Sequence, residues 1–226
     1  MIRNILFVVE GRTEGFAHAF GKGLQNILRD ECQFMREKGI RFHTIPKNGK
    51  GDLLSNIGFD VRAHLNPPKK RKEKLGKQGS AKGDFVFILR DLDCGNEAKV
   101  KKEILDRIDP GFHRSVEIHF AVQEIESWFF ADPEGFSNTY SSPPKSLISK
   151  MVKRVPKNRS PEDAIGCDPM PSKVLEDLAD ACKLSYRKTI EGPQALLKVD
   201  PQKVANRCPH FCAFQTSLRQ KINYGS

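Results

Sequence analysis

Acidic side chains follow three segments of the chain that have the pattern of β-strands. The segments are residues 4–9, 85–89 and 115–122, and the acids are Glu10, Glu14, Asp91, Asp93, Glu124 and Glu126. The first two segments are continuous apolar runs, typical of strands buried on both faces of a parallel sheet, and the third alternates between apolar and polar residues. In open α/β sheets the ligand site lies beyond the carboxyl ends of the strands. We therefore expect up to six carboxylates to converge on one crevice.

Carboxylates gathered in one crevice need a counter-charge, because like charges at short range repel one another or take up protons. Mg²⁺ or Mn²⁺ would meet that need, since hard divalent cations prefer oxygen ligands and keep water molecules for substrate phosphates. The spacing Asp91-x-Asp93 in an extended segment places two carboxylates on the same side, which suits a single cation. Single acids also have structural explanations: Glu14 would complement a helix N-terminus, and Glu126 would lie on a helix surface.

Helical patterns separate the expected strands. The expected helices cover residues 14–30, with Thr13 as the N-cap, 52–65 and 97–108, and a further short strand covers residues 42–45. Strands that alternate with helices predict an α/β fold, with a mostly parallel, Rossmann-type sheet flanked by helices.

The part of the chain after about residue 144 has no strand pattern. Helical stretches there lie near residues 146–154, 172–182, 194–197 and 201–206, separated by Pro and Gly. We therefore expect an α/β domain over residues 1–143 and a C-terminal α-helical extension over residues 144–226.

The formal net charge of +10 is divided unevenly along the chain. Residues 84–143 carry 6 basic and 12 acidic side chains, whereas residues 67–83 carry 7 and 1, and residues 144–226 carry 15 and 8. The stretch 67–83 also contains Pro and Gly and few apolar residues, which predicts a flexible basic loop. It is either a solvated loop or a contact for a phosphate backbone. In the second case the contacting residues are Lys69, Lys70, Arg71, Lys72 and Lys74.

The apolar runs are too short for a membrane protein. None approaches the roughly 18 residues of a membrane span, and the run near the N-terminus is shorter than the roughly 7–15 residues of a signal-peptide core. We expect a cytoplasmic protein whose six cysteines are reduced. Cys208, His210 and Cys212 form either a fragment of a metal site or, because no second ligand pair follows, small buried thiols near a helix start.

The residues around the first acids resemble a known family. Residues 9–14, Val-Glu-Gly-Arg-Thr-Glu, together with the Asp91-x-Asp93 pair, resemble a Toprim domain, the metal-binding fold shared by topoisomerases, primases, small nucleases and OLD-type nucleases. The chain also resembles a bacterial family of Toprim-like proteins of unknown function, often encoded beside ATPases. This second likeness extends through residues 124–132 and into the tail at residues 186–192 and 207–211.

The resemblance implies roles for individual residues. It assigns Glu10 as a general acid/base or metal-bridging glutamate, Asp91 and Asp93 as metal ligands, and Glu14 as a ligand of a second metal ion. Glu124 and Glu126 lie where OLD-type domains place a further acid. Arg187 and Lys188 are candidates for the basic residue near the scissile phosphate, and the alternative for both is a helix surface or a salt bridge.

Three functions are compatible with these features. The favoured one is metal-dependent cleavage of phosphodiester bonds in DNA or RNA, with two cations about 3.5–4 Å apart and basic segments holding the nucleic acid. The alternative is a non-catalytic subunit that binds nucleic acid or metal and acts with an ATPase partner, for example in phage defence. The third is transfer of a phosphoryl or nucleotidyl group to a small substrate. The segment Gly49-Lys-Gly51-Asp52 lacks the full P-loop pattern, so the chain encodes no nucleotide motor of its own.

Overall fold

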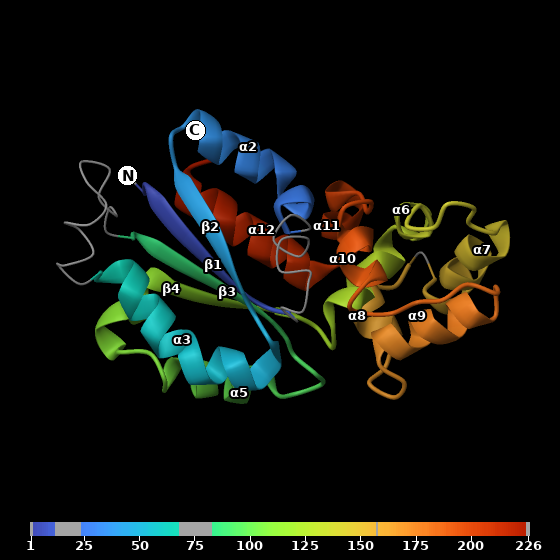
Figure 1. Cartoon of the computed structure of the whole chain (residues 1–226), viewed down its shortest axis with the longest axis horizontal. Helices are drawn as coiled ribbons and strands as arrows, with labels where there is room; N and C mark the ends of the chain where they lie inside the picture. Colours follow the sequence, from blue (N-terminus) through green and yellow to red (C-terminus); the bar gives the residue numbers. More distant parts are fainter. Residues whose placement is uncertain (1, 12–23, 68–82, 157, 225–226) are drawn as a thin grey trace.

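The computed structural model of the chain describes residues 2–11, 24–67, 83–156 and 158–224 (Figure 1). Two expectations therefore concern residues outside these ranges: the start of the helix expected at residues 14–30, with Glu14, and the basic side chains of the loop expected at residues 67–83. None of the helices in the described ranges combines the length and the apolar character of a membrane span.

Four parallel strands form a sheet in the order β2-β1-β3-β4. They are β1 (Asn4–Glu10), β2 (Arg41–Lys47), β3 (Phe85–Asp91) and β4 (Val116–Ala121). The register pairs Glu10 with Lys47 and Asp91 with Ala121, so the carboxyl ends of the strands lie at one edge of the sheet. The expected parallel sheet and the Rossmann-like α/β class are confirmed.

Helices cover both faces of this sheet, because the side chains of each strand alternate between two apolar cores (Figure 1). Ile5 and Phe7 point into the core that is closed by α2 and α12, whereas Leu6 and Val8 point into the core that is closed by α3 and α5. These helices are α2 (Arg29–Glu37), α3 (Gly49–Leu65), α5 (Glu97–Leu105) and α12 (Pro209–Ile222). The two layers pack against the strands on both faces and so position the residues at the strand ends.

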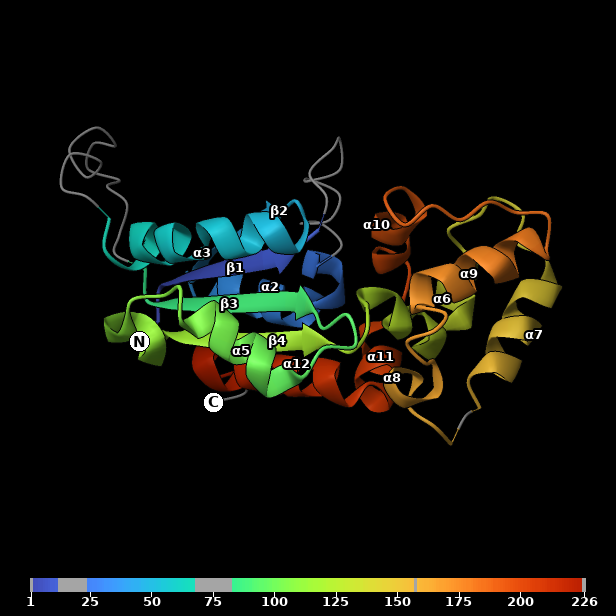
Figure 2. The ribbon, with the colours of Figure 1, turned by 90° about the horizontal axis from the view of Figure 1, so that it is seen from below.

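A helical lobe, residues 125–207, lies beyond the carboxyl edge of the sheet (Figure 2). Its elements are η3 (Ile125–Ala131), α6 (Pro133–Ser137), α7 (Lys145–Arg154), α8 (Pro161–Ala164), α9 (Pro171–Asp180), α10 (Glu191–Leu196) and α11 (Pro201–Arg207). Trp128, Phe129 and Phe130 of η3 are fully buried in the same apolar core as Ile5 and Phe7. The lobe and the sheet therefore share one core.

The helical stretches expected after residue 144 are present, but the sequence patterns do not predict α12. This helix returns to the sheet and packs against β4 and α2. Its buried residues Phe211, Phe214, Leu218 and Ile222 are spaced by three and four positions, the spacing of one helix face. Polar residues and an initial Cys-Pro-His segment obscure this pattern. The domain boundary between residues 143 and 144 stays a prediction, while α12 ties the end of the chain to the sheet.

Candidate functional site

A cavity of ≈ 350 Å³ lies between the carboxyl edge of the sheet and the helical lobe. Its walls come from the ends of β1 and β3, from Gly49 at the start of α3, from the start of η3, and from residues 188, 189, 192 and 193 ahead of and within α10. The titratable side chains that line it are Glu10, Asp91, Asp93, Glu126 and Lys188. The strand ends and the lobe thus contribute opposite sides of one site.

Three of the predicted acids are held by hydrogen bonds from residues of the lobe. Asp91 Oδ1 accepts from the backbone N–H of Ile125 at 2.9 Å, and Glu124 Oε2 accepts from that of Ser172 at 2.8 Å. Glu126 Oε1 accepts from the Tyr186 hydroxyl at 3.2 Å. These bonds fix the carboxylates in direction as well as in position, because each has one oxygen anchored and one turned toward its neighbours.

Lys188 places its ammonium group between these three carboxylates. Its Nζ lies 2.7 Å from Glu124 Oε1, 3.3 Å from Asp91 Oδ2 and 3.3 Å from Glu126 Oε2. Burial lowers the pKa of Lys188, but the charges of the three carboxylates outweigh that effect and raise its pKa above the ordinary value. Lys188 is therefore charged at neutral pH and supplies one positive charge to a cluster of three acids.

Glu10 has a separate basic partner. Its Oε2 lies 3.1 Å from Nε of Arg90, which is 2 % exposed and precedes Asp91 on β3. Burial and the charge of Asp91 raise the pKa of Glu10 from 4.5 to about 7, although Arg90 acts in the opposite direction. A carboxyl group with a pKa close to neutral pH both accepts and donates protons readily.

The remaining carboxyl groups differ in their affinity for protons. Burial raises the pKa values of Asp91, Asp93 and Glu126, and Lys188 only partly offsets this. Burial acts in the same direction on Glu124, but the charge and hydrogen bond of Lys188 and the hydrogen bonds from Ser172 lower its pKa below the ordinary value. The site as described is short of positive charge, since Lys188 and Arg90 face five acids, and burial favours the protonated form of each.

The structure brings together most of the predicted site residues that it describes. Glu10, Asp91, Asp93, Glu126 and Lys188 line the same cavity, and Glu124 joins them through Lys188. The interpretation of Glu126 as a surface residue is wrong, because its neighbours in η3 pack into the core and leave it 1 % exposed. Arg187 lies 3.4 Å from Glu191 and Lys188 contacts three carboxylates, so the salt-bridge alternative holds for both residues. Glu14, Lys69, Lys70, Arg71, Lys72 and Lys74 lie outside the described residues.

Sequence reasoning missed two residues of the site. Arg90 is a charged residue inside an apolar strand pattern, and such a residue needs an acidic partner when the strand is buried. That signal was available. Tyr186 is 5 % exposed and donates to Glu126 across 60 positions of sequence, and nothing in its local sequence indicates that contact.

The chemistry of the donors fits a hard divalent cation. The donors that line the cavity are carboxylate oxygens, the ligands that Mg²⁺ and Mn²⁺ prefer. Glu126 Oε2 is buried, and among the described residues its partner is the Lys188 ammonium group at 3.3 Å, so a cation that displaces Lys188 can bind this oxygen. In the described ranges no group of three or more His, Cys, Asp or Glu side chains has the spacing of a metal centre, and Lys188 lies among the acids instead. A cation at this site would compete with Lys188 for the same oxygens.

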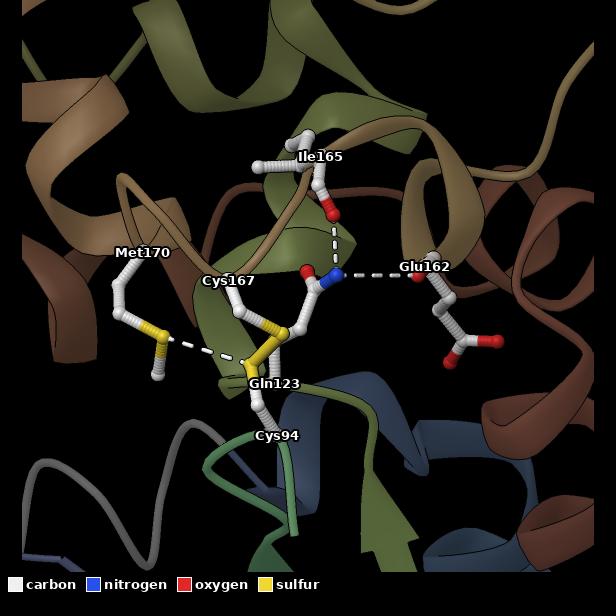
Figure 3. The surroundings of a disulfide bond; sticks show 6 residues. All are labelled: Cys94, Gln123, Glu162, Ile165, Cys167 and Met170. Atoms are coloured by element: carbon white, nitrogen blue, oxygen red, sulfur yellow. Dashed lines mark hydrogen bonds between the residues drawn. A yellow bond between two sulfur atoms is a disulfide. The ribbon is translucent and has the colours of Figure 1, made fainter.

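The cysteines differ from the expectation that all six are reduced. Cys94 and Cys167 form a disulfide with a Cα–Cα distance of 5.9 Å (Figure 3). The two residues are 73 positions apart, and only the packing of the lobe against the strand ends brings them together. Cys208 is buried and Cys212 is exposed, while His210 Nδ1 lies 3.2 Å from Glu162 Oε2.

Comparisons with known proteins identify a family without assigning an activity. No curated protein and no solved structure matches the chain. A family described as a domain of unknown function matches residues 9–219, which include both the strand-end acids and the helical lobe. The chain therefore belongs to the DUF4276 family.

Proposed function

We propose that the protein is a divalent-metal-dependent nuclease that hydrolyses phosphodiester bonds of DNA or RNA in the cavity at the carboxyl edge of the sheet. One observation carries the proposal: Glu10, Asp91, Asp93 and Glu126, from separate strand ends and the lobe, converge on one cavity of ≈ 350 Å³. Several carboxylates that line one cavity are the ligand set of two-metal phosphodiester hydrolases. The resemblance to Toprim domains is part of this proposal.

Glu10, Asp91 and Asp93 would hold the cation, with Glu124 and Glu126 beside them. Bound there, Mg²⁺ or Mn²⁺ would neutralise the acids and stabilise charge on a phosphate oxygen. If Glu10 instead stays outside the coordination sphere of the cation, it would take a proton from a water molecule, because burial and Asp91 raise its pKa to about 7.

Lys188 gives the cavity a positive charge of its own. Its ammonium group lies between three acids, and its side chain is 44 % exposed, so it can reach a phosphate group that enters the cavity. The proposed role of Lys188 is to bind a non-bridging phosphate oxygen. Lys69, Lys70, Arg71, Lys72 and Lys74, with Arg187 at the rim of the lobe, would contact the nucleic-acid backbone. The proposal places the protein in the cytoplasm, where DNA and RNA are found, with an ATPase as a partner in phage defence.

A second function, a non-catalytic nucleic-acid-binding or interaction subunit of an ATPase-containing complex, is favoured by one specific observation. Lys188 already balances part of the acid cluster through contacts at 2.7, 3.3 and 3.3 Å. A cluster that the chain neutralises internally can serve to hold the lobe against the sheet. Under this alternative the protein binds nucleic acid but leaves it intact.

Nicking of supercoiled plasmid and cleavage of RNA, each with Mg²⁺ or Mn²⁺, test the proposal. Asp91→Asn keeps the oxygen that accepts from Ile125 and removes the charge, and it is expected to lower the cleavage rate by at least about 100-fold. Asp180→Asn is the matched control, because Asp180 is an exposed residue at the end of α9. If the wild type and Asp91→Asn cleave equally, the proposed site is wrong. Binding without cleavage by both would favour the alternative.

A further inference from the structure

The loop that carries the acid pair of β3 is covalently joined to the helical lobe. Asp91 ends β3, Asp93 lines the cavity, and Cys94 is bonded to Cys167 in the segment between α8 and α9 (Figure 3). The bond therefore lies one residue away from a proposed cation ligand and links the two sides of the site.

Both sulfur atoms belong to exposed residues. Cys94 and Cys167 are exposed, whereas the free Cys32 and Cys208 are buried. An exposed disulfide is open to exchange with a thiol from solution, and exposed disulfides are the ones most often reducible under physiological conditions. The position and exposure of the bond together make it accessible to a dithiol reductant.

The backbone at the bond adopts a conformation that needs external support. Asp93 and Cys94 have φ values of +48° and +59°, in the left-handed region that residues other than glycine rarely adopt. Such conformations persist where the surrounding structure fixes them. Here the contacts that fix the loop include the disulfide, the hydrogen bond from the Asp93 N–H to the Gln123 carbonyl at 2.8 Å and the contact of Cys94 Sγ with Met170 Sδ at 3.7 Å.

The other acids are anchored independently of the disulfide. Asp91 accepts from Ile125 and Glu124 accepts from Ser172. The Gln123 side chain also donates to the carbonyl of Glu162 at 3.4 Å and to that of Ile165, which keeps the lobe attached to the end of β4 (Figure 3). Breaking the disulfide would therefore loosen the loop at Asp93, which keeps its hydrogen bond to Gln123, and would not detach the lobe as a whole.

We propose that the Cys94–Cys167 disulfide is a redox-controlled clamp that holds Asp93 in place to bind a divalent cation, and that its reduction by a dithiol weakens the site; the effect on the cation rests on the proposed function. In the reduction the S–S bond breaks and each sulfur takes up one electron and one proton. The dithiol supplies both electrons and both protons and forms its own disulfide. Oxidation restores the clamp by the reverse exchange with a disulfide.

Electron paramagnetic resonance, used to measure binding of Mn²⁺, tests the clamp. The full chain is measured in its oxidised form, and again after reduction with dithiothreitol and removal of the reductant. Reduction is expected to lower the Mn²⁺ affinity by about 10-fold, as loss of the groups that orient a ligand does in metal sites. Cys94→Ser is expected to show the low affinity in both states. Cys212→Ser, which replaces an exposed free cysteine, is expected to keep the redox response of the wild type.

Hydrogen–deuterium exchange at residues 92–95 gives a readout that needs neither metal nor activity. The proposal expects faster exchange there on reduction, with little change in β3. Equal Mn²⁺ affinity in both states overturns the clamp, and so does unchanged exchange at residues 92–95. If the oxidised protein binds no Mn²⁺, the proposed function fails, and exchange alone decides whether the loop is clamped. If Mn²⁺ binding responds to reduction but nucleic acid stays intact, the clamp stands and the nuclease proposal falls.

Discussion

Replacement of Lys188 by methionine tests whether this side chain is the internal counter-charge of the acid cluster. Methionine keeps most of the length of the side chain and removes the ammonium group, which lies 2.7–3.3 Å from three carboxylate oxygens. Without that charge, Asp91, Glu124 and Glu126 repel one another at close range. We expect opposite effects on stability and on cation binding.

The magnitude follows from the distances and the exposure of Lys188. A pair of unit charges 3 Å apart interacts by about 5 kcal/mol at an effective dielectric constant of about 20. Desolvation of both partners offsets most of this, and solvent screens a side chain that is 44 % exposed. We therefore expect a net loss of about 2 kcal/mol in the free energy of unfolding without metal, which lowers the melting temperature of a chain of this size by about 4–8 °C.

The assay is thermal unfolding in a chelator and then across a series of Mn²⁺ concentrations. In the wild type a cation competes with the Lys188 ammonium for the same oxygens, whereas in Lys188→Met it does not. The variant is therefore expected to have a lower melting temperature in the chelator. Its melting temperature should also rise more on addition of Mn²⁺, because the stabilisation by a ligand grows with its affinity. Lys198→Met is the control, since Lys198 is an exposed residue that follows α10 in the same lobe.

Two results would refute the reasoning. Melting of Lys188→Met within about 1 °C of the wild type in the chelator would mean that Lys188 does not balance the cluster. A smaller gain from Mn²⁺ in the variant than in the wild type would mean that cation and lysine do not compete for the same oxygens.

Two further predictions concern pH and the role of α12. Burial and Asp91 raise the pKa of Glu10 to about 7, so the folded protein binds a proton more tightly than the unfolded chain does. The free energy of unfolding of the metal-free protein should therefore fall by at most about 3 kcal/mol as pH rises from about 4.5 to 7. In urea unfolding Glu10→Gln should show a flatter dependence on pH, and equal slopes in wild type and variant would contradict this prediction. A fragment of residues 1–143 should not fold, because it lacks α12 and with it the buried Phe214. In the full chain, Phe214→Ala should lower the free energy of unfolding by about 3–5 kcal/mol. Cooperative melting of the fragment, followed by circular dichroism, would disprove the prediction that the fragment does not fold.

The strands and most helices could be predicted because their signals are local. An apolar run such as residues 4–9 has one favourable environment, the interior of a parallel sheet. The convergence of Glu10 and Asp91 also followed from sequence, since parallel strands place their carboxyl ends at one edge. α12 escaped prediction because its four buried apolar residues are interrupted by polar ones, and its helix face becomes evident only against the sheet.

The contacts that decide the character of the site could not be predicted, because they join distant positions. Lys188 meets Glu124 across 64 residues and Asp91 across 97. A lysine in a helical tail has the same local sequence whether it faces solvent or an acid cluster. The same holds for Cys94 and Cys167, whose spacing of 73 residues carries no signal of pairing.

The sequence by itself determined that carboxylates stand at the ends of buried parallel strands, because hydropathy and strand topology are properties of short segments. The tertiary structure alone decided which charges balance these acids, that Glu126 is buried, and that a disulfide joins the acid loop to the lobe. The physical reason is that ion pairs and disulfides depend on distances of a few ångströms, and the packing of the lobe against the sheet sets those distances.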